Sequence, residues 1–338
     1  MLTALPAPPR GADHAAARIV WIDLVDPTPD ERSMIEIDYG LRLPTRDNLS
    51  EVQSSSRLAE DSGVLFMSVP AGAHGHADDE ASSPIGFVLS KDLLVTMRWA
   101  PSRSFDAATA RLSKCAHASS AEAFAIVVEE LVDSTADRLE DVAADLDRMS
   151  RSVFRRTAAT RRLGARTGAR TGARTAEALR HRLEVRSNEA LRNRLIDIGN
   201  AGERLSQLRG RLAGLRRIVP FACDPARDWI GDDIRSRLHV AQNDLVSLTD
   251  YQAHLSDKVA FLLDAVLGFI STKQNDIFAA LTIVSVVGIP PMLVASVYGM
   301  NFKHMPELDW DWGYPFALIL IVLSTILPIL WFKWRGWL

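Results

Sequence analysis

Cysteine is scarce in this sequence, and neither sign of charge dominates it. The two cysteines, Cys115 and Cys223, belong to no CxxC or Cys/His spacing, which argues against a structural zinc site and a disulfide framework. The 39 basic and 42 acidic residues give a formal net charge of −3, so the composition does not suggest a nucleic-acid partner. Nucleophile-elbow, phosphate-loop and metalloprotease motifs are also missing, so we expect neither an enzyme nor an organic cofactor.

A secretory leader is absent as well. Residues 1–17 are rich in proline and alanine and lack a basic start followed by an apolar core. We expect them to form a disordered N-terminus, and we expect the large part of the chain that follows them to stay in the cytoplasm.

Charged residues are missing from two long C-terminal runs, 277–297 and 314–332. Each run has about the ~20 residues with which an α-helix crosses a bilayer. A buried helix of a soluble protein could explain one such run. Two runs separated by a short loop instead predict two transmembrane helices, at 277–300 and 314–332.

The charges around the spans predict their orientation. Lys273 precedes the first span, Lys333 and Arg335 follow the second, and the connecting loop is net acidic. Because basic residues favour the cytoplasmic side, we expect loop 301–313 to be periplasmic. The tail at 333–338 and the N-terminus would both be cytoplasmic.

The loop between the spans holds the most specific motif. Tyr298-Gly299-Met300-Asn301 ends the first span, Met305-Pro306-Glu307-Leu308 follows, and Tyr314-Pro315 opens the second span. From about Lys273 to the C-terminus, this combination resembles the CorA family of magnesium channels. The resemblance implies a homopentamer in a bacterial-type inner (plasma) membrane that conducts Mg²⁺ and also Co²⁺ or Ni²⁺. It further implies closure by regulatory Mg²⁺ bound between neighbouring subunits.

The resemblance also assigns roles to residues. Gly299, Met300 and Asn301 would form the selectivity filter, where amide oxygens of Asn301 contact the water shell of Mg²⁺, an ion that loses its water reluctantly. The acidic loop residues Glu307, Asp309 and Asp311 would concentrate cations outside the filter. The pore-lining positions would be Asn275, Phe278, Leu281, Ser285, Ile289, Met292 and Ser296, with Asp264 as an inner polar ring and Asp244, Asp250 and Asp257 as regulatory metal candidates. Helical spacing alone does not separate this lumen face from a packing face.

Residues 18–118 predict a small α/β domain. Residues 18–25 are typical of a buried strand, and Thr28 to Glu31 form a capping box that starts a helix. Further strands are expected at 64–69, 85–89 and 93–98, the last two as a hairpin, with a helix at 105–116. The loop at 71–80 holds two histidines and three acidic residues, but its glycines and alanines favour a solvated loop over a metal site.

Residues 119–225 predict a long antiparallel pair of helices. A capping box at 119–122 starts a helix to about Thr157, and an arginine-rich helix at 176–217 follows. Asp133, Asp137, Asp141 and Asp145 form one stripe whose like charges require a basic partner helix, bound cations or both. Three copies of Gly-Ala-Arg-Thr fill 164–175, so we expect a flexible tip at 158–175.

Residues 226–276 predict a stalk helix that runs without interruption into the first span. Its apolar positions repeat every 3.5 residues, as in helices that share a seam. They are Ala241, Leu245, Leu248, Gln252, Leu255, Val259, Leu262, Val266 and Phe269. Such a long rod requires either self-association or a docked domain to support it.

The fold class we predict is therefore an α+β membrane protein: a cytoplasmic α/β domain, a coiled-coil-like helical stalk and two C-terminal transmembrane helices. A Zn²⁺ transporter of the same superfamily is an alternative, although the Gly-Met-Asn triplet favours Mg²⁺. A membrane-anchored coiled-coil scaffold is an alternative from another class, but it leaves the triplet and the acidic loop unexplained.

Overall fold

The structure is a computed structural model that describes residues 2–5, 19–50, 58–69, 84–115, 118–167, 173–300 and 312–336. The chain divides into two compact units, residues 1–263 and 264–338, and the long helix α6 passes from the first unit to the second. Each unit is described by itself.

A six-stranded sheet forms the α/β domain, with the strand order β1-β2-β6-β5-β4-β3. Strands β2 and β6 are parallel, and all other neighbours are antiparallel. The strands are β1 Leu2–Leu5, β2 Trp21–Val25, β3 Leu58–Asp61, β4 Val64–Val69, β5 Ile85–Leu89 and β6 Leu94–Arg98. The predicted strands at 64–69 and 85–89 and the predicted hairpin are confirmed, whereas β1 and β3 were not expected.

Strand β1 corrects the prediction of a disordered N-terminus over its first residues. Leu2 pairs with Leu24 and Leu5 pairs with Trp21, so this short apolar segment satisfies the free backbone groups along the edge of β2. Residues 6–17 lie outside the described residues.

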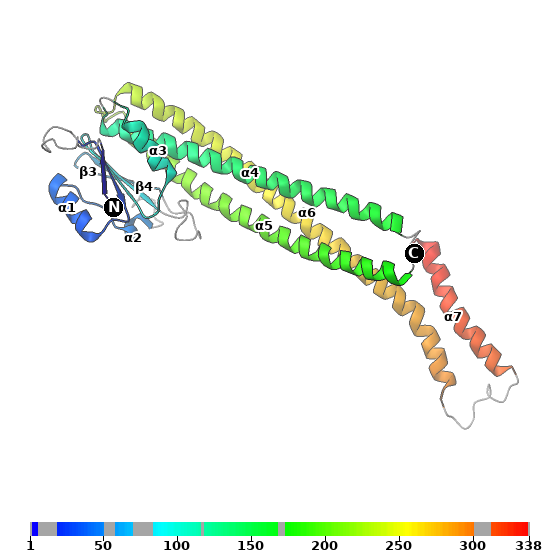
Figure 1. The fold of residues 1–338 in the computed structure, drawn as a ribbon. Helices are drawn as coiled ribbons and strands as arrows, with labels where there is room; N and C mark the ends of the chain where they lie inside the picture. The colour runs from blue at the N-terminus through cyan, green and yellow to red at the C-terminus, as the bar shows by residue number, and fades with distance from the viewer. Residues whose placement is uncertain are drawn as a thin grey trace. The chain divides into compact units, whose positions relative to one another are not determined.

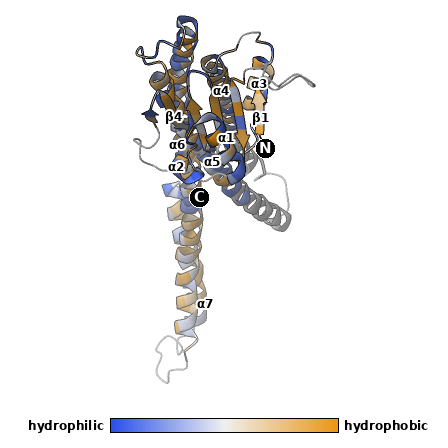
Figure 2. Cartoon of the chain, turned by 90° about the vertical axis from the view of Figure 1, so that its left-hand side faces the viewer, coloured by the Kyte–Doolittle hydropathy of each residue, from blue (hydrophilic) through white to orange (hydrophobic). Residues whose placement is uncertain are grey.

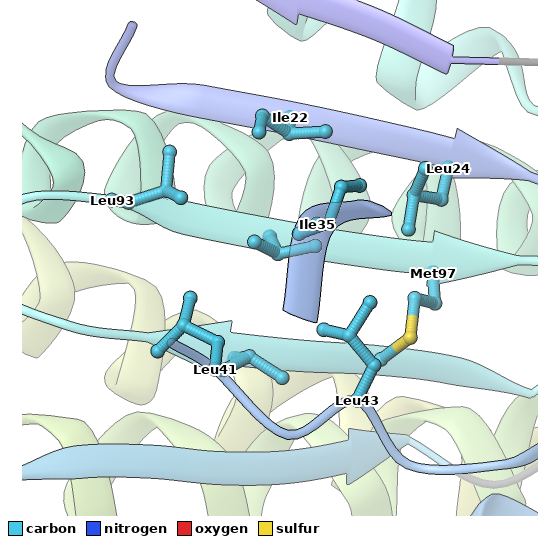
Figure 3. Close-up of a cluster of buried hydrophobic side chains, with 9 residues drawn as sticks. Ile22, Leu24, Ile35, Leu41, Leu43, Leu93 and Met97 are labelled. Carbon is cyan, nitrogen blue, oxygen red and sulfur yellow. The ribbon is translucent and has the colours of Figure 1, made fainter. Parts of the chain in front are cut away.

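The central strands are buried on both faces because helices cover both. On one face, α1 (Pro29–Tyr39) and the segment after it cover β2 and β6, with Ile35, Leu41 and Leu43 over Ile22 and Met97 (Figure 3). On the other face lie α3 (Arg103–Leu112) and the start of α4. There the rings of Phe87 and Phe124 meet edge to face at 5.8 Å, and those of Trp21 and Phe105 lie 6.2 Å apart. A short helix, α2 (Arg46–Ser50), completes the domain.

The start of α1 is built as the sequence predicts. The backbone N–H of Glu31 donates to the Thr28 hydroxyl at 3.2 Å, and the Glu31 carboxylate accepts from the Thr28 N–H at 3.1 Å. These two bonds satisfy amide donors that the first turn of a helix otherwise leaves free. Gly40 ends the helix with a left-handed φ of 66°.

A buried polar network ties the two parallel strands together. Asp23 on β2 accepts from the Arg98 guanidinium of β6 at 2.9 Å and from the Thr96 hydroxyl at 2.7 Å. The indole N–H of Trp21 donates to Thr96 at 2.9 Å, and the Arg98 guanidinium lies over the Phe105 ring. The charges are therefore paired, as buried charges must be.

Three long helices extend from the sheet (Figure 1): α4 Ser120–Thr167, α5 Ala173–Ala222 and α6 Asp232–Tyr298. The predicted cap of α4 is present, because the Glu122 N–H donates to the Ser119 hydroxyl at 3.1 Å. The expected pairing of α4 with α5 is confirmed by an ion pair of 2.6 Å between Asp145 and Arg204.

The flexible tip predicted at 158–175 is mostly helical. Helix α4 continues past the expected end near Thr157 to Thr167, and α5 already begins at Ala173. Alanine and arginine are good helix formers, which offsets the roughly 1 kcal/mol that Gly164 costs within α4. Residues 168–172 are outside the described part of the chain.

The start of α6 also differs from the prediction, at Asp232 instead of residue 226. Turns occupy the intervening residues, and contacts of the Arg227 side chain hold these turns in place. It pairs with Glu60 of β3 at 2.8 Å, donates to the Phe221 carbonyl and lies over the Phe221 ring. Arg235 in the first turn of α6 donates to the Arg227 carbonyl at 2.7 Å.

The apolar seam of α6 is covered within the same chain. Gln252 of α6 donates to the Leu205 carbonyl of α5, and Val259 packs beside Gly202 of α5. Every predicted seam residue of the first unit, from Ala241 to Leu262, is buried or half-buried. The docked α4–α5 hairpin therefore supports the rod in the first unit, and the seam gives no reason of its own to infer self-association.

The second unit consists of the end of α6 and α7 (Gly313–Arg335). Hydrophobic residues recur along the whole of α7, as Figure 2 shows. Gly336 ends this helix with a left-handed φ of 74°, and its N–H donates to the Lys333 carbonyl at 3.2 Å.

Candidate ion pathway

Both apolar helices are uncovered by the chain itself. The most apolar 18-residue windows of α6 and α7 are 0% and 6% buried, respectively, and both helices are long enough to cross a bilayer. The core helix of a soluble protein would be mostly buried. An apolar helix without protein cover fits insertion into lipid.

The stripe predicted to line a pore lies on α6 and is open. Phe278, Leu281, Ile289 and Met292 are 64%, 61%, 58% and 75% exposed, and Ser285 is half-exposed. Apolar residues on the other faces are exposed too, including Val284 at 69% and Leu293 at 60%. One chain therefore presents an apolar surface all around this helix. Which face meets lipid and which faces other copies stays a prediction.

The hydroxyls in this stretch are bonded to their own helix. Ser285 donates to the Leu281 carbonyl at 2.9 Å, and Thr282 donates to the Phe278 carbonyl at 2.8 Å. Such a bond satisfies the donor in an apolar environment and leaves the oxygen lone pairs available as acceptors. Ser285 could thus offer a neutral oxygen to a hydrated cation.

Pro290 and Pro291 lie inside α6, which remains one helix through them. Proline has no N–H, so the carbonyls of Val286 and Val287, four residues earlier, lose their helical donors. The sequence predicts such freed backbone oxygens, which a lumen or neighbouring helices could satisfy.

Gly299 stands where α6 ends, close to a carbonyl of the last turn of the helix. Its N–H donates to the Ala295 carbonyl at 3.0 Å, and a Cβ on Gly299 would come within 3.1 Å of that oxygen. Its φ is not in the left-handed region, so the expected tight turn is not of the kind that only glycine adopts. Met300 follows with its N–H bonded to the Val297 carbonyl at 3.2 Å and is 45% exposed.

The remaining filter and loop residues lie outside the described residues: Asn301, Glu307, Asp309 and Asp311. The structure therefore brings Gly299 and Met300 to the end of an uncovered apolar helix, and the role of Asn301 stays a prediction.

The inner ring and regulatory candidates are all exposed on α6. Asp264 and Asn275 are exposed, as are Asp244, Asp250 and Asp257. Asp250 and Asp257 share a face but lie two turns apart, roughly 10 Å, which is too far for one ion to bind both. In the described part of the chain, no three His, Cys, Asp or Glu side chains cluster as a metal site. One chain alone therefore does not assemble the regulatory site.

The acidic stripe of α4 is partly neutralised by α5. Hydrogen bonding from Arg204 holds the pKa of the Asp145 carboxyl below its usual value. Asp133, Asp137 and Asp141 are exposed. Partial burial, together with the charges of Glu130, Asp137 and Glu129, raises the pKa of Asp133. An arginine of α5 therefore neutralises one end of the stripe, and the carboxylates at the other end still repel one another.

Sequence reasoning missed an ion-pair cluster that joins α3, α4 and α6. The Arg237 guanidinium of α6 binds the Glu129 carboxylate of α4 through two bonds of 2.9 Å, which raises the pKa of Arg237. Glu122 lies 3.6 Å from Arg237, and Arg111 of α3 reaches Glu129 at 2.6 Å. The seven-residue spacing of Glu122 and Glu129 was the available signal, because it puts both on one face of α4.

The fold and the exposed apolar helices together define a class of protein: an α/β domain joined by a long helix to a helical pair that fits insertion into a membrane. Comparison with known proteins gives the family. The chain matches the CorA-like Mg²⁺ transporter proteins over residues 16–167 and 169–334, and it belongs to this family. The family is one of transport proteins and not of enzymes.

A curated relative supports the same assignment. The chain is 31% identical to the magnesium transport protein CorA of Escherichia coli strain K12, over 94% of this chain and 92% of the relative. The similarity therefore includes the α/β domain, the long helices and both apolar helices.

Solved structures share the fold. The complete CorA magnesium transporter of Methanocaldococcus jannaschii matches with a TM-score of 0.68 at 16% identity, covering 94% of this chain and 91% of that one. The cytoplasmic domain of ZntB from Vibrio parahaemolyticus matches with a TM-score of 0.50 at 13% identity, covering 75% of this chain and 88% of that one. The fold is thus shared with proteins of two different names and does not by itself identify the ion.

Proposed function

We propose that five copies of this chain form a channel that admits Mg²⁺ across the inner membrane, with both termini in the cytoplasm. The observation that carries the proposal is the end of α6, an apolar helix uncovered by its own chain that leads into Gly299-Met300-Asn301 in a member of the CorA-like family. The name of the Escherichia coli relative supports Mg²⁺ as the principal ion. Co²⁺ and Ni²⁺ would be further substrates.

The path would run along the stripe from Asn275 to Ser296, with one α6 helix from each subunit around the axis. Leu281 and Ile289 supply apolar constrictions that close by dewetting, whereas Ser285 supplies an oxygen between them. The two prolines add backbone carbonyls without helical donors near Ile289. A path of neutral oxygens and apolar rings holds a divalent ion loosely enough to let it pass.

Selection would occur at Asn301. Five neutral amide oxygens hydrogen-bond to the water shell of Mg²⁺, which keeps several of its waters when bound. A ring of carboxylates at the same place would bind the ion too tightly for rapid release. The acidic residues Glu307, Asp309 and Asp311 raise the local cation concentration outside this ring.

Regulation would occur on the exposed face of the cytoplasmic half of α6. Asp250 and Asp257 lie on one face of α6, and both are exposed. Carboxylates from two subunits that meet there would repel one another until Mg²⁺ neutralises them. A fall in internal Mg²⁺ would then separate the subunits and open the pore.

The test is metal uptake by proteoliposomes that contain only this protein, with protein-free liposomes as the measure of leak. We expect uptake of Mg²⁺ above leak, with Co²⁺ and Ni²⁺ also entering. Uptake of Zn²⁺ without Mg²⁺ would assign the chain to the zinc branch instead. No uptake of any divalent ion by correctly assembled protein would favour a membrane-anchored scaffold.

A further inference from the structure

The end of the α4–α5 hairpin is strongly basic, although the whole chain carries a formal charge of −3. The last part of α4, residues 151–167, has six arginines and no acidic residue. The first part of α5, residues 173–186, has four arginines and two glutamates. These two helical stretches together carry a net charge of +8, so the rest of the chain carries −11.

The hairpin end lies at the end of the bundle from which α6 continues toward its apolar run. Contacts between α4 and α6 follow one another in the same order along both helices, so the helices run in the same direction (Figure 1). The pairs, in order, are Glu129 with Arg237, Asp147 with Lys258, and Phe154 with Phe261. Past the Phe154–Phe261 stack, α4 continues for 13 residues to Thr167, roughly 20 Å. Along the sequence of α6, the apolar run that begins at Ile277 follows 16 residues after Phe261.

We propose that the basic hairpin end, residues 151–167 and 173–186, binds the anionic phospholipid headgroups of the membrane that the chain's own apolar helices enter. Because α4 and α6 run in the same direction, the basic hairpin end is at the end of the bundle from which α6 leaves the first unit. Arginine is suited to it, because its planar guanidinium forms paired hydrogen bonds to phosphate. Polybasic segments next to a membrane span are attracted by anionic lipid at the cytoplasmic surface. The inference rests on the proposed membrane insertion, but not on conduction.

The experiment is hydrogen–deuterium exchange of the full-length protein in lipid nanodiscs, made once with phosphatidylcholine and once with added phosphatidylglycerol. We expect the backbone amides of 151–167 and 173–186 to exchange at least about fivefold more slowly in the anionic discs, the factor supplied by about one arginine at such a surface. The exchange of β5 and β6 should not change. Because uptake of Mg²⁺ is not the readout, failure here and failure of the channel proposal are distinguishable.

A charge-matched pair of variants makes the result specific. The tip variant carries Arg161→Gln, Arg162→Gln and Arg166→Gln on α4. The control variant carries Arg209→Gln, Arg216→Gln and Arg217→Gln, three exposed arginines near the other end of α5. The tip variant should lose most of the lipid-dependent slowing, and the control variant should keep it.

Three outcomes would overturn the proposal. Equal exchange in both kinds of disc would show that lipid charge does not reach the hairpin. Protection that is equal in both discs and vanishes at high salt would show that the arginines contact protein carboxylates. Slowing caused by added polyuridylate RNA, with no response to phosphatidylglycerol, would identify a nucleic acid as the ligand.

Discussion

The side-chain amide of Gln252 on α6 donates a hydrogen bond across 3.3 Å to the backbone carbonyl of Leu205 on α5, and the same nitrogen lies 2.9 Å from the Ser256 hydroxyl. Gln252 is only 5% exposed, so it is a polar residue in an otherwise apolar seam. The bond fixes how far α6 is shifted along α5, because a slip of one turn would leave the amide buried without this acceptor.

Replacement of Gln252 by alanine should therefore destabilise the helical bundle. We expect a loss of about 1–2 kcal/mol, from the hydrogen bond and from the packing that the side chain provides. Thermal unfolding of the full-length protein in detergent, followed by circular dichroism, measures it. Asn243→Ala, at an exposed position of the same helix, is the control and should unfold like the parent. An unchanged midpoint for Gln252→Ala would mean that the seam does not depend on this bond.

The Asp145–Arg204 ion pair should contribute stability that depends on pH. Its hydrogen bonds hold the pKa of Asp145 below the ordinary 3.8. A carboxyl with a lowered pKa contributes its stability above that ordinary value and loses it as the pH falls through the lowered one. Both side chains are partly exposed, so we expect Arg204→Ala to cost about 0.5 kcal/mol at pH 7. The difference should shrink below pH 3.8. A difference that does not depend on pH would assign the loss to packing alone.

The carboxylate of Asp133 should lower the stability of the protein at neutral pH, whereas that of Asp145 raises it. The pKa of Asp133 is raised by partial burial and by the acidic groups around it, so its ionised form opposes folding above that raised pKa. Asp133→Asn should therefore stabilise the protein at pH 7 by about 0.3 kcal/mol, the size of one like-charge helix pair. Glu140→Gln, an exposed change of the same charge on α4, is the control. If Asp133→Asn lowers the unfolding midpoint, the carboxylate has a stabilising partner and the repulsion account is wrong.

Gly299 and Gly288 both lie on the apolar part of α6, the first in the turn that ends the helix and the second inside it. A Cβ on Gly299 would approach the Ala295 carbonyl to 3.1 Å, whereas a Cβ on Gly288 would meet no atom within 4 Å outside its own stretch of helix. Gly299→Ala should therefore distort the backbone just before Asn301 and reduce Mg²⁺ uptake several-fold, and Gly288→Ala should have little effect. Initial uptake into proteoliposomes, normalised to assembled protein, compares them. Equal uptake by both variants would show that the filter tolerates a shift at the helix end.

Much of the fold could be predicted from local signals. The capping boxes at Thr28 and Ser119, the hairpin around Lys91 and the two apolar runs all depend on residues close together in the sequence, and each prediction agrees with the elements that form. Strand β1 could not be predicted, because Leu2–Leu5 is extended only through its pairing with β2. Helix α4 runs past its predicted end near Thr157, because alanine and arginine offset the weak helix propensity of Gly164.

The partner of the α6 seam could not be predicted at all. A 3.5-residue repeat specifies that another helix packs along it, but not which chain supplies that helix. The contacts of Gln252 and Val259 with α5 supply the answer for the first unit.

The predicted pentamer therefore rests on the family resemblance alone, and the native mass of the detergent-solubilised protein tests it. Five times the 37.3 kDa subunit is expected, and a stable dimer would contradict the pore.

The loss of uptake caused by a substitution should depend on where the residue lies along the proposed pore, and not only on the group that is removed. Asp264 and Asn275 are exposed on α6 at the cytoplasmic side of the apolar run, where each ring would hold the ion less closely than the filter does. We expect Asp264→Ala and Asn275→Ala to reduce uptake less than a change at Asn301. Equal or larger losses at these two positions would place selectivity at the inner end.

The most direct test of the account is initial Mg²⁺ uptake by proteoliposomes carrying Asn301→Ala, with the oligomer size checked against the parent protein. The substitution removes every amide acceptor from the proposed ring and leaves α6 and α7 unchanged in sequence, so folding and assembly should survive while uptake falls to the leak of empty liposomes. Asn301→Asp should instead bind divalent ions more tightly and release them more slowly, because it places several carboxylates in one ring. Uptake at the parental rate by correctly assembled Asn301→Ala protein would contradict the filter assignment and the mechanism built on it.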